Sequence, residues 1–415
     1  ASSGPRAFYF FFGLLLFVGL VSGAYPAVYI SSFTPIKIFN GREKFSQRSL
    51  FSRILLTMQF VLAFTAIVGA FVFIDNAVYQ KNKDWGYGHS LVIVVPVANH
   101  SQYLALRDKV RNAKHFESLA GAANPIGEQN TQVSFDHLQQ RIQTVFYQVD
   151  FDYLETMDVR LKEGRTFDRT IQSDHGESVI VNEAFVAAMG WTNPLSNDFE
   201  FEGKKRYVIG VVKDFHYNGF YNPIGPAMFM TTGEDNLRFL AVRTGSENFF
   251  AAEDELKKMW HEVAPDDPYL GYRQDSVFDD FHNDNNSNIK LLSFVSTVAV
   301  ILACLGLYGL VSYNITRRLK EFSVRKVFGA NTRQIFGLMN RDYVWILAIA
   351  FALGAPAGFY LINVIIHQIY PEPKATTASP FLIAVGLMAV TVAITIGSQL
   401  RRVVKESPAM TLRND

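Results

Sequence analysis

The sequence predicts a helical membrane protein with five spans and an α+β domain inserted between the second and third spans. Three observations support this fold class: long apolar runs, an uneven distribution of basic residues, and one long polar connecting segment. The apolar runs are 8–30, 54–74, 291–313, 343–367 and 381–400. The connecting segment, 75–290, is large enough to bury a core of its own.

Each apolar run is long enough to cross a bilayer, which takes about 20 residues. None of the runs contains Lys or Arg, and soluble core helices are rarely this long and this uniformly apolar. The first run lacks the Ala-x-Ala pattern of a cleaved signal peptide and holds Pro26 near its end. The chain begins with Ala1 rather than Met, so we expect its natural start to be missing or removed.

Basic residues predict the orientation, because Lys and Arg close to span ends are retained in the cytoplasm. Segments 31–53, 314–342 and 401–415 are rich in Lys and Arg, whereas 368–380 contains only Lys374. We therefore place the three basic segments inside the cell and 368–380 outside. Counting spans then puts 75–290 outside and the C-terminus in the cytoplasm.

Strand-like and helix-like segments alternate within 75–290, which predicts an α+β or α/β domain. Runs rich in β-branched and aromatic residues predict strands, and apolar residues at helical spacing predict helices. The predicted strands are 89–97, the first part of 177–191, 205–216, 226–232 and 237–244. The predicted helices are 101–113, a helix that begins near Asn182 and ends at Gly190, and 247–265.

The sequence lacks the motifs of common enzyme classes, with no GxxxxGK[ST], no HExxH and no GxSxG. Its single cysteine, Cys304, excludes an intrachain disulfide and a CxxC metal site. We predict that the chain is not an enzyme and holds no cofactor or metal. A net charge of +1 argues against nucleic acid as a partner. Asp214 and His216 lie two apart on a predicted strand and would suit a base with its orienting carboxylate, although a polar contact beside a turn is the commoner role.

The basic segment 317–330, RRLKEFSVRKVFGA, predicts a short helix with a charged face. Arg318, Glu321 and Arg325 fall on one side at spacings of three and four, in the favourable acid-before-base order. Gly329 suits the end of such a helix. Two interpretations remain: attachment to lipid headgroups, or docking of a cytoplasmic partner.

The fourth span contains Gly354, Pro356 and Gly358, a small-xxx-small spacing around a proline. Small residues at this spacing allow two membrane helices to approach closely. Close packing of spans is therefore one interpretation, and mere tolerance of glycine and proline in a span is the other.

These segments resemble MacB/FtsX-type ABC permeases. The stretch RRLKEFSVRKVFGANTRQIF is similar to their cytoplasmic coupling segment, and residues 178–230 are similar to the later half of their periplasmic core domain. The matching coupling residues are Arg318, Glu321, Arg325, Lys326, Gly329 and Ala330. The stretches YPAVYISSFTPIKIFNG and ESPAMTLRND look like the ends of the last span in two successive permease units. The closest resemblance is to Bacteroidetes-type permeases with two such units in tandem.

The resemblance implies the following domain boundaries. They are 1–53 for the last span of a first unit with its cytoplasmic linker, 54–74 for a span, 75–290 for a periplasmic MacB-like core domain, 291–400 for an FtsX-like three-span domain with coupling helix 317–330, and 401–415 for a cytoplasmic tail. It also implies a multi-pass protein of the bacterial inner membrane, surrounded by lipid. The first permease unit would lie on the same chain or on another.

The resemblance further implies a mechanism in which a separate cytoplasmic ABC ATPase, acting as a dimer, moves the coupling helix. The third span would carry that movement to the periplasmic domain and drive efflux or extraction of a cargo such as a lipoprotein or an antimicrobial. Arg318, Glu321, Arg325, Lys326 and Gly329 would form the ATPase-coupling site. The alternative is a non-transporting, FtsX-like signalling subunit that activates a periplasmic partner, either an adaptor or a cell-wall hydrolase.

Overall fold

The computed structural model describes residues 12–13, 46–128, 130–137, 140–245, 249–327 and 332–405. Only the backbone is described for 46–51, 314, 316–327, 332–342 and 400–405. The predicted first span, 8–30, lies outside the described residues except at positions 12–13.

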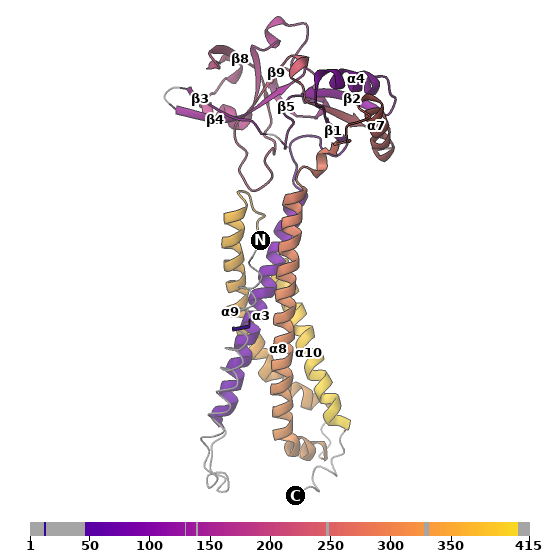
Figure 1. Ribbon diagram of the computed structural model, residues 1–415. Coiled ribbons are helices and arrows are strands. Elements are labelled where there is room, and N and C mark those ends of the chain that lie inside the picture. The colour runs from indigo at the N-terminus through magenta and orange to yellow at the C-terminus, as the bar shows by residue number, and fades with distance from the viewer. Residues whose placement is uncertain are drawn as a thin grey trace. The chain divides into compact units, whose positions relative to one another are not determined.

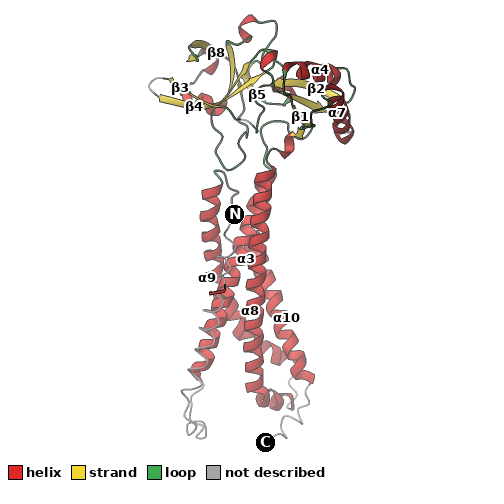
Figure 2. Cartoon of the chain, in the orientation of Figure 1, coloured by secondary structure: helices red, strands yellow, loops and turns green. Residues whose placement is uncertain are grey.

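Four long helices contain the other four predicted spans (Figures 1 and 2). They are α3 (Ser46–Lys81), α8 (Asp279–Val327), α9 (Thr332–Ile369) and α10 (Ser379–Lys405). Their parts long and apolar enough to cross a membrane are Ser52–Lys81, Asp279–Tyr313, Tyr343–Ile369 and Ser379–Gln399. Together with the mixed sheet described below, these helices confirm the predicted fold class.

Two of these helices extend well beyond the apolar runs. Helix α3 continues past Asp75 and Asn76, where the apolar run ends, and helix α8 begins with the acidic residues Asp279 and Asp280. Acidic side chains stabilise the first turn of a helix by interacting with its dipole. The polar ends of both helices make contacts outside the apolar region, which are described in the next subsection.

The chain forms two compact units. The first comprises 1–59, 306–347 and 396–415, and its described part consists of helical segments in which Gly306 lies against Gln59. The second comprises 60–305 and 348–395, and it contains the sheet together with the adjoining parts of α3, α8, α9 and α10. All contacts discussed below lie within this second unit.

Residues 82–278, here called the sheet domain, form one branched mixed sheet. The strands are β1 (Val92–Pro96), β2 (Phe116–Ala122), β3 (Gln132–His137), β4 (Gln140–Val149), β5 (Leu161–Gly164), β6 (Ser178–Asn182), β7 (Asp198–Phe201), β8 (Lys204–Val212), β9 (Ala227–Thr231), β10 (Phe239–Thr244) and β11 (Tyr272–Arg273). Their order is β11-β1-β10-β2-β4-β9-β6-β8-β5, with β3 paired to β4 and β7 paired to β8. Strands β1 and β11, the first and last of the domain, are direct antiparallel neighbours.

The helices of the sheet domain confirm the three predicted from the sequence. They are α4 (His100–Arg111), α5 (Tyr153–Thr156), α6 (Glu183–Met189) and α7 (Phe249–Val263), with 3-10 turns at Gln172–Asp174, Pro194–Ser196, Glu234–Asn236 and Gln274–Ser276. The Asn99 side chain accepts from Gln102 N–H at the start of α4. Helix α6 ends at Gly190, whose φ of 67° suits glycine.

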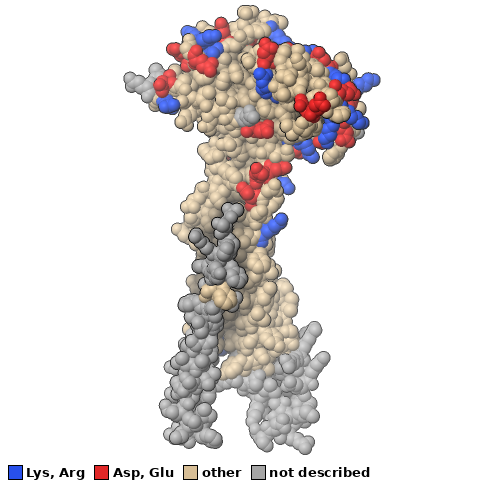
Figure 3. All heavy atoms as spheres, in the orientation of Figure 1, with Lys and Arg blue, Asp and Glu red and all other residues tan. Residues whose placement is uncertain are grey.

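Two hydrophobic cores hold the sheet domain together. Helices α4 and α7 cover β1 and β10, with Leu106 and Leu256 completely buried between them. The second core lies under α6 and brings Phe185 against Phe199 of β7. Burial of each such side chain stabilises the fold by about 1.5–3 kcal/mol. On the face shown in Figure 3, charged side chains gather on the sheet domain, and the described helical segments are mostly uncharged.

Candidate functional site

The sheet domain meets the membrane helices in a cluster of polar and aromatic side chains that we call the collar. Four segments contribute to it: the end of α3, the start of α8, the loop 213–226 that follows β8, and the α9–α10 loop. The collar residues are Asp75, Asn76, Gln80, Lys83, Trp85, Phe220, Tyr221, Phe278, Phe281, Asp284, Asn285, Tyr370, Glu372 and Lys374. These segments are joined by direct contacts, so movement of any one of them acts on the others.

Lys374 joins the α9–α10 loop to the end of α3. Its main-chain N–H donates to Asn76 Oδ1 at 2.9 Å, and its ammonium lies 2.6 Å from Asp75 Oδ1. Asn76 is only 2% exposed, so this hydrogen bond satisfies an oxygen that water does not reach. These contacts give partners to the two polar residues that follow the apolar run 54–74 within α3.

Glu372 makes a second connection between the same two segments. Gln80 Nε2 donates to the Glu372 carbonyl oxygen at 2.8 Å, and the Lys83 ammonium lies 2.5 Å from Glu372 Oε2. The hydrogen bond from Lys83 lowers the pKa of the Glu372 carboxyl. Because Gln80 is 1% exposed, the contact that matters most for stability is the buried amide rather than the solvent-exposed carboxylate.

Aromatic rings connect the loop 213–226 to the start of α8. The Phe281 ring lies 4.7 Å from the Tyr221 ring and 5.1 Å from the Phe220 ring, centroid to centroid. The Phe278 ring lies 4.6 Å from Trp85, which follows the end of α3. Each such pair adds about 0.5–1.5 kcal/mol beyond the burial of its area.

Tyr370 completes the collar from the α9–α10 loop. Its hydroxyl donates to Asn285 Oδ1 on α8, and both side chains are almost completely buried. Its ring lies 6.0 Å from that of Tyr221. Tyr370 therefore contacts α8 and the sheet domain at once.

The segment that leaves α3 is fixed directly to the sheet. The Gly88 N–H donates to the Met157 carbonyl at 2.8 Å, and Arg243 of β10 donates to the carbonyl oxygens of Thr156 and Gly88. Gly86 has a φ of 84°, and a Cβ there would lie 2.5 Å from the Asp214 carbonyl oxygen, so only glycine fits. These bonds hold the polypeptide rigidly between α3 and β1.

Asp214 and His216 do not form a catalytic pair. Strand β8 ends at Val212, so both residues lie in the loop that follows it. The predicted strand, 205–216, extends too far toward the C-terminus. Asp214 Oδ1 accepts from the Asn182 amide and from Ala184 N–H, both at 2.9 Å, and so caps α6. The His216 ring lies 4.5 Å from Phe220, and burial lowers the pKa of His216 to about 4.

The structure describes the predicted coupling residues only in part. Helix α8 contains Arg318, Glu321, Arg325 and Lys326, but only their backbone is described, and Gly329 lies outside the described residues. Their role in docking a partner stays a prediction. Within the described ranges, no three His, Cys, Asp or Glu side chains cluster in a way that would hold a metal ion.

Gly354 and Gly358 of α9 lie against α3. A Cβ on Gly354 would lie 2.5 Å from the Val61 carbonyl oxygen, and a Cβ on Gly358 would lie 2.4 Å from that of Thr65. The Thr65 hydroxyl also donates to the Gly354 carbonyl oxygen at 3.2 Å. Pro356 lies inside α9 between the two glycines. Whether this packing serves the function of the protein stays a prediction.

The collar itself was not identified from the sequence. The local signal is the aromatic-rich stretch FHYNGFYNP at 215–223, whose sequence suggests a role for His216 but gives no indication of the partners of Phe220 and Tyr221. The partners of these rings, Phe281 and Tyr370, are distant in the sequence and carry no motif.

Comparison with known proteins gives matches along much of the chain. Residues 293–408 match the family model described as FtsX-like permease C-terminal. The chain is 24% identical over 198 residues to the "Macrolide export ATP-binding/permease protein MacB" of Aggregatibacter actinomycetemcomitans, covering 46% of this chain and 30% of that protein. It is 23% identical over 265 residues to the "Uncharacterized ABC transporter permease YvrN" of Bacillus subtilis (strain 168), covering 58% of this chain and 64% of that protein. The chain thus spans about a third of the length of the MacB relatives it matches.

A solved structure also shows a likeness. The crystal structure of the periplasmic region of MacB from Actinobacillus actinomycetemcomitans matches with a TM-score of 0.35 and 13% identity. The match covers 48% of this chain and 95% of that chain.

Proposed function

Since this chain is a MacB/FtsX-type permease, we propose that it is the permease subunit of an ABC transporter and transmits movement from a cytoplasmic ATPase to the sheet domain. ATP hydrolysis takes place on the ATPase, which acts as a dimer. The sheet domain lies in the periplasm, the C-terminus lies in the cytoplasm, and the spans lie in the bacterial inner membrane.

One observation carries this proposal: α8 is a single helix of 49 residues, Asp279–Val327, that begins in the collar and includes most of the basic segment. A bilayer requires about 20 residues, so this helix extends beyond the membrane at both ends. The sequence of α8 contains no proline, which would kink the helix and absorb displacement. A helix of this kind transmits a push or a rotation applied at one end.

The collar supplies the connection at the sheet-domain end. Phe281 on the first turns of α8 contacts Phe220 and Tyr221, and the loop that carries these two residues leads directly into the central strand β9. The end of α3 is joined to β1 through the bonds around Gly88. Displacement of α8 relative to α3 would therefore move the two cores of the sheet domain differently.

At the cytoplasmic end, the proposal assigns ATPase docking to Arg318, Glu321, Arg325, Lys326 and Gly329. The acid-before-base pair Glu321 and Arg325 would keep the charged face of the helix ordered for a partner. The transported or released substrate is a cargo of the periplasm or of the outer half of the membrane.

Charge reversal at Glu321 tests the docking step. The chain is purified in lipid nanodiscs with its ATPase, and we expect Glu321→Arg to abolish copurification while insertion and the Tm remain unchanged. The matched control is Glu155→Arg, a reversal at an exposed position of the sheet domain. Equal recovery of the ATPase with both variants would show that the basic segment contacts lipid only. Uptake of labelled cargo into vesicles then separates export from activation of a periplasmic partner.

A further inference from the structure

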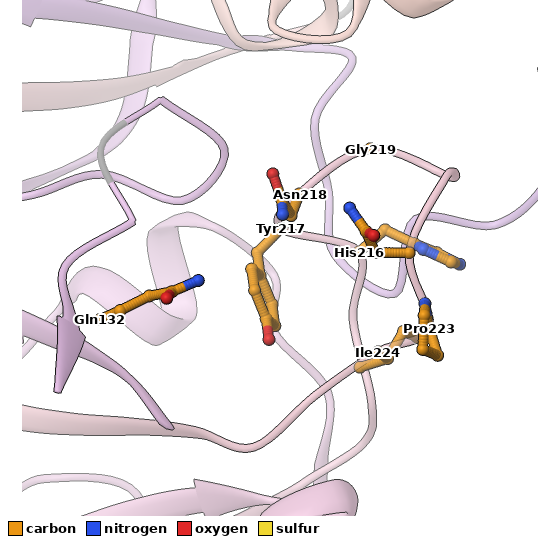
Figure 4. Close-up of a pocket in the computed structure, with 8 residues that line it drawn as sticks. Gln132, His216, Tyr217, Asn218, Gly219, Pro223 and Ile224 are labelled. Carbon is orange, nitrogen blue, oxygen red and sulfur yellow. The ribbon is translucent and has the colours of Figure 1, made fainter. Parts of the chain in front are cut away.

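The loop that contributes to the collar also lines a pocket. The pocket has a volume of about 300 Å³ and is lined mainly by residues of the loop after β8, with Gln132 of β3 reaching toward Tyr217 (Figure 4). The lining residues that carry the argument are Gln132, Tyr217, Asn218, Asn222, Pro223 and Ile224. This volume lies at the lower end of the range for small-molecule sites, about 300–1,000 Å³.

The pocket is held in shape by the sheet beneath it. The Asn130 amide donates to the Tyr217 carbonyl oxygen at 3.0 Å, and Tyr147 of β4 donates to Asn130 Oδ1 at 2.7 Å. Tyr217 is itself largely buried, so its ring has a fixed position. A loop that is tied to a central strand in this way does not need to reorganise before it binds a ligand.

The chemistry of the lining is polar and uncharged. None of its residues is Lys, Arg, Asp or Glu, and His216, which also lines the pocket, is neutral near pH 7 because burial lowers its pKa. The side-chain amides of Gln132, Asn218 and Asn222 make no hydrogen bond with other described residues. Each amide offers both donors and an acceptor.

These features select a class of ligand. A charged ligand would find no counter-charge here, and a purely apolar one would strip water from the three amides without replacing its hydrogen bonds. A sugar ring fits better, because its hydroxyl groups both donate and accept while its C–H face packs on an apolar wall. Tyr217, Pro223 and Ile224 provide such a wall.

We propose that this pocket binds a neutral saccharide and that the collar responds to its occupancy. Asn218 lines the pocket, Phe220 contacts Phe281 of α8, and only Gly219 separates them, in a turn with a φ of 66°. A small displacement of Asn218 by a bound ligand therefore passes through one residue to Phe220 and acts on the start of α8. The response of the collar rests on the proposed function, whereas binding of the saccharide does not.

Binding is tested with the full chain in lipid nanodiscs, free of maltoside detergent and of glycolipid, because sugar headgroups would compete. The probes are maltose and N,N′-diacetylchitobiose, and saturation-transfer NMR and calorimetry measure their affinity. We expect Gln132→Ala and Asn222→Ala each to weaken binding about two- to tenfold, the loss of one hydrogen bond. The control Gln143→Ala, at an exposed position of β4 outside the pocket, should bind like the wild type.

Two results would overturn the binding site. One is that neither saccharide binds at up to about 10 mM, the weak end of measurable affinities, and the other is equal affinity in all variants. Tighter binding of a diglycine amide probe would overturn the saccharide assignment in favour of a peptide.

The response of the collar is measured separately by hydrogen exchange in residues 279–286 of α8, which do not line the pocket. We expect exchange there to slow when a probe is bound. Binding with unchanged exchange would overturn the response while leaving the site in place. Because the ATPase is absent from both measurements, failure of ATPase docking would not be mistaken for failure of the pocket.

Discussion

Replacing Gly358 by alanine should separate α9 from α3. The added Cβ would lie 2.4 Å from the Thr65 carbonyl oxygen and 2.9 Å from Thr65 Cα, whereas ordinary contact begins near 3.4 Å. Both obstacles are backbone atoms, which cannot rotate away as a side chain would. The helices must therefore move apart by about 1 Å, judged from that shortfall and from the close packing of protein interiors.

The free-energy change follows from three contributions. Overpacking of this kind costs about 1–3 kcal/mol. Separation also stretches the 3.2 Å hydrogen bond from Thr65 to the Gly354 carbonyl oxygen, a loss of about 0.6 kcal/mol in a membrane protein. Alanine recovers about 0.8–1 kcal/mol through its higher helix propensity. The net expectation is a destabilisation of about 0.6–2.8 kcal/mol.

Gly386→Ala is the matched control, because a Cβ at this position of α10 meets no atom within 4 Å. It gains helix propensity without a clash and should be neutral or slightly stabilising. Thermal unfolding of both variants in nanodiscs, followed by tryptophan emission, is expected to lower the Tm of Gly358→Ala by about 2–5 °C relative to the control. A Tm for Gly358→Ala equal to or above that of Gly386→Ala would refute the close approach of the two helices.

Three further predictions concern the collar and the sheet domain. Phe281→Ala should lower the free energy of unfolding by about 3–5 kcal/mol and speed hydrogen exchange in the loop 213–226. The control Phe294→Ala, at a position 67% exposed on the same helix, should do neither. Similar behaviour of the two variants would contradict the packing of Phe281 in the collar. Asp174 is completely buried and lies 2.5 Å from Arg165 Nη1, so Asp174→Asn should cost about 1–3 kcal/mol at pH 7. Burial opposes ionisation of Asp174, but the hydrogen bonds from Arg165, the Ser178 hydroxyl and the Asp168 N–H together outweigh it and lower the pKa. The contribution of Asp174 to stability is therefore present above about pH 4 and is lost as the pH falls further, and an equally acid-sensitive Asn variant would contradict this. Burial raises the pKa of Asp150 to about 7, so the sheet domain should lose stability as the pH rises from about 4 to 7. Asp150→Asn should therefore reduce the difference in Tm between pH 5 and pH 8. An unchanged difference would contradict the raised pKa of Asp150.

The membrane part of the fold is readable from the sequence because crossing a bilayer imposes length and apolarity on each segment separately. Each of the four described spans is recognisable from its own length and apolarity, without reference to the other spans. The strands β1, β6, β9 and β10 and the helices α4, α6 and α7 were also predictable, since their β-branched runs and helical spacing are local.

Strands β2, β3 and β5 have no comparable signal, whereas β4, QRIQTVFYQV, contains β-branched and aromatic residues and carries a local signal that the predicted strands do not include. Strand β2, FESLAGA, contains no β-branched residue and is defined by its pairing with β10, far along the chain. Strand β3 alternates in exposure but is short and polar. Such strands depend on long-range partners more than on their own propensity, so a single sequence does not reveal them.

The candidate site was the least predictable part. Asp75 is joined to Lys374 across 299 positions, and neither residue belongs to a motif. The spacing of Gly354 and Gly358 predicted a close approach without indicating that α3 is the partner. The resemblance to known permeases implies a site at residues 317–330, near the end of α8, whereas the contacts that the structure describes are concentrated at the start of this helix.

The pairing of β1 with β11 has a consequence for how such proteins diversify. Ile93 lies opposite Arg273 and Val94 lies opposite Tyr272, so the polypeptide enters and leaves the sheet domain through neighbouring strands. An insertion with adjacent ends can be exchanged for another without respacing the helices that carry it. Replacing the whole sheet domain on the same pair of helices, α3 and α8, is then a small evolutionary step, and it offers a practical route to chimaeras with a different domain between these helices.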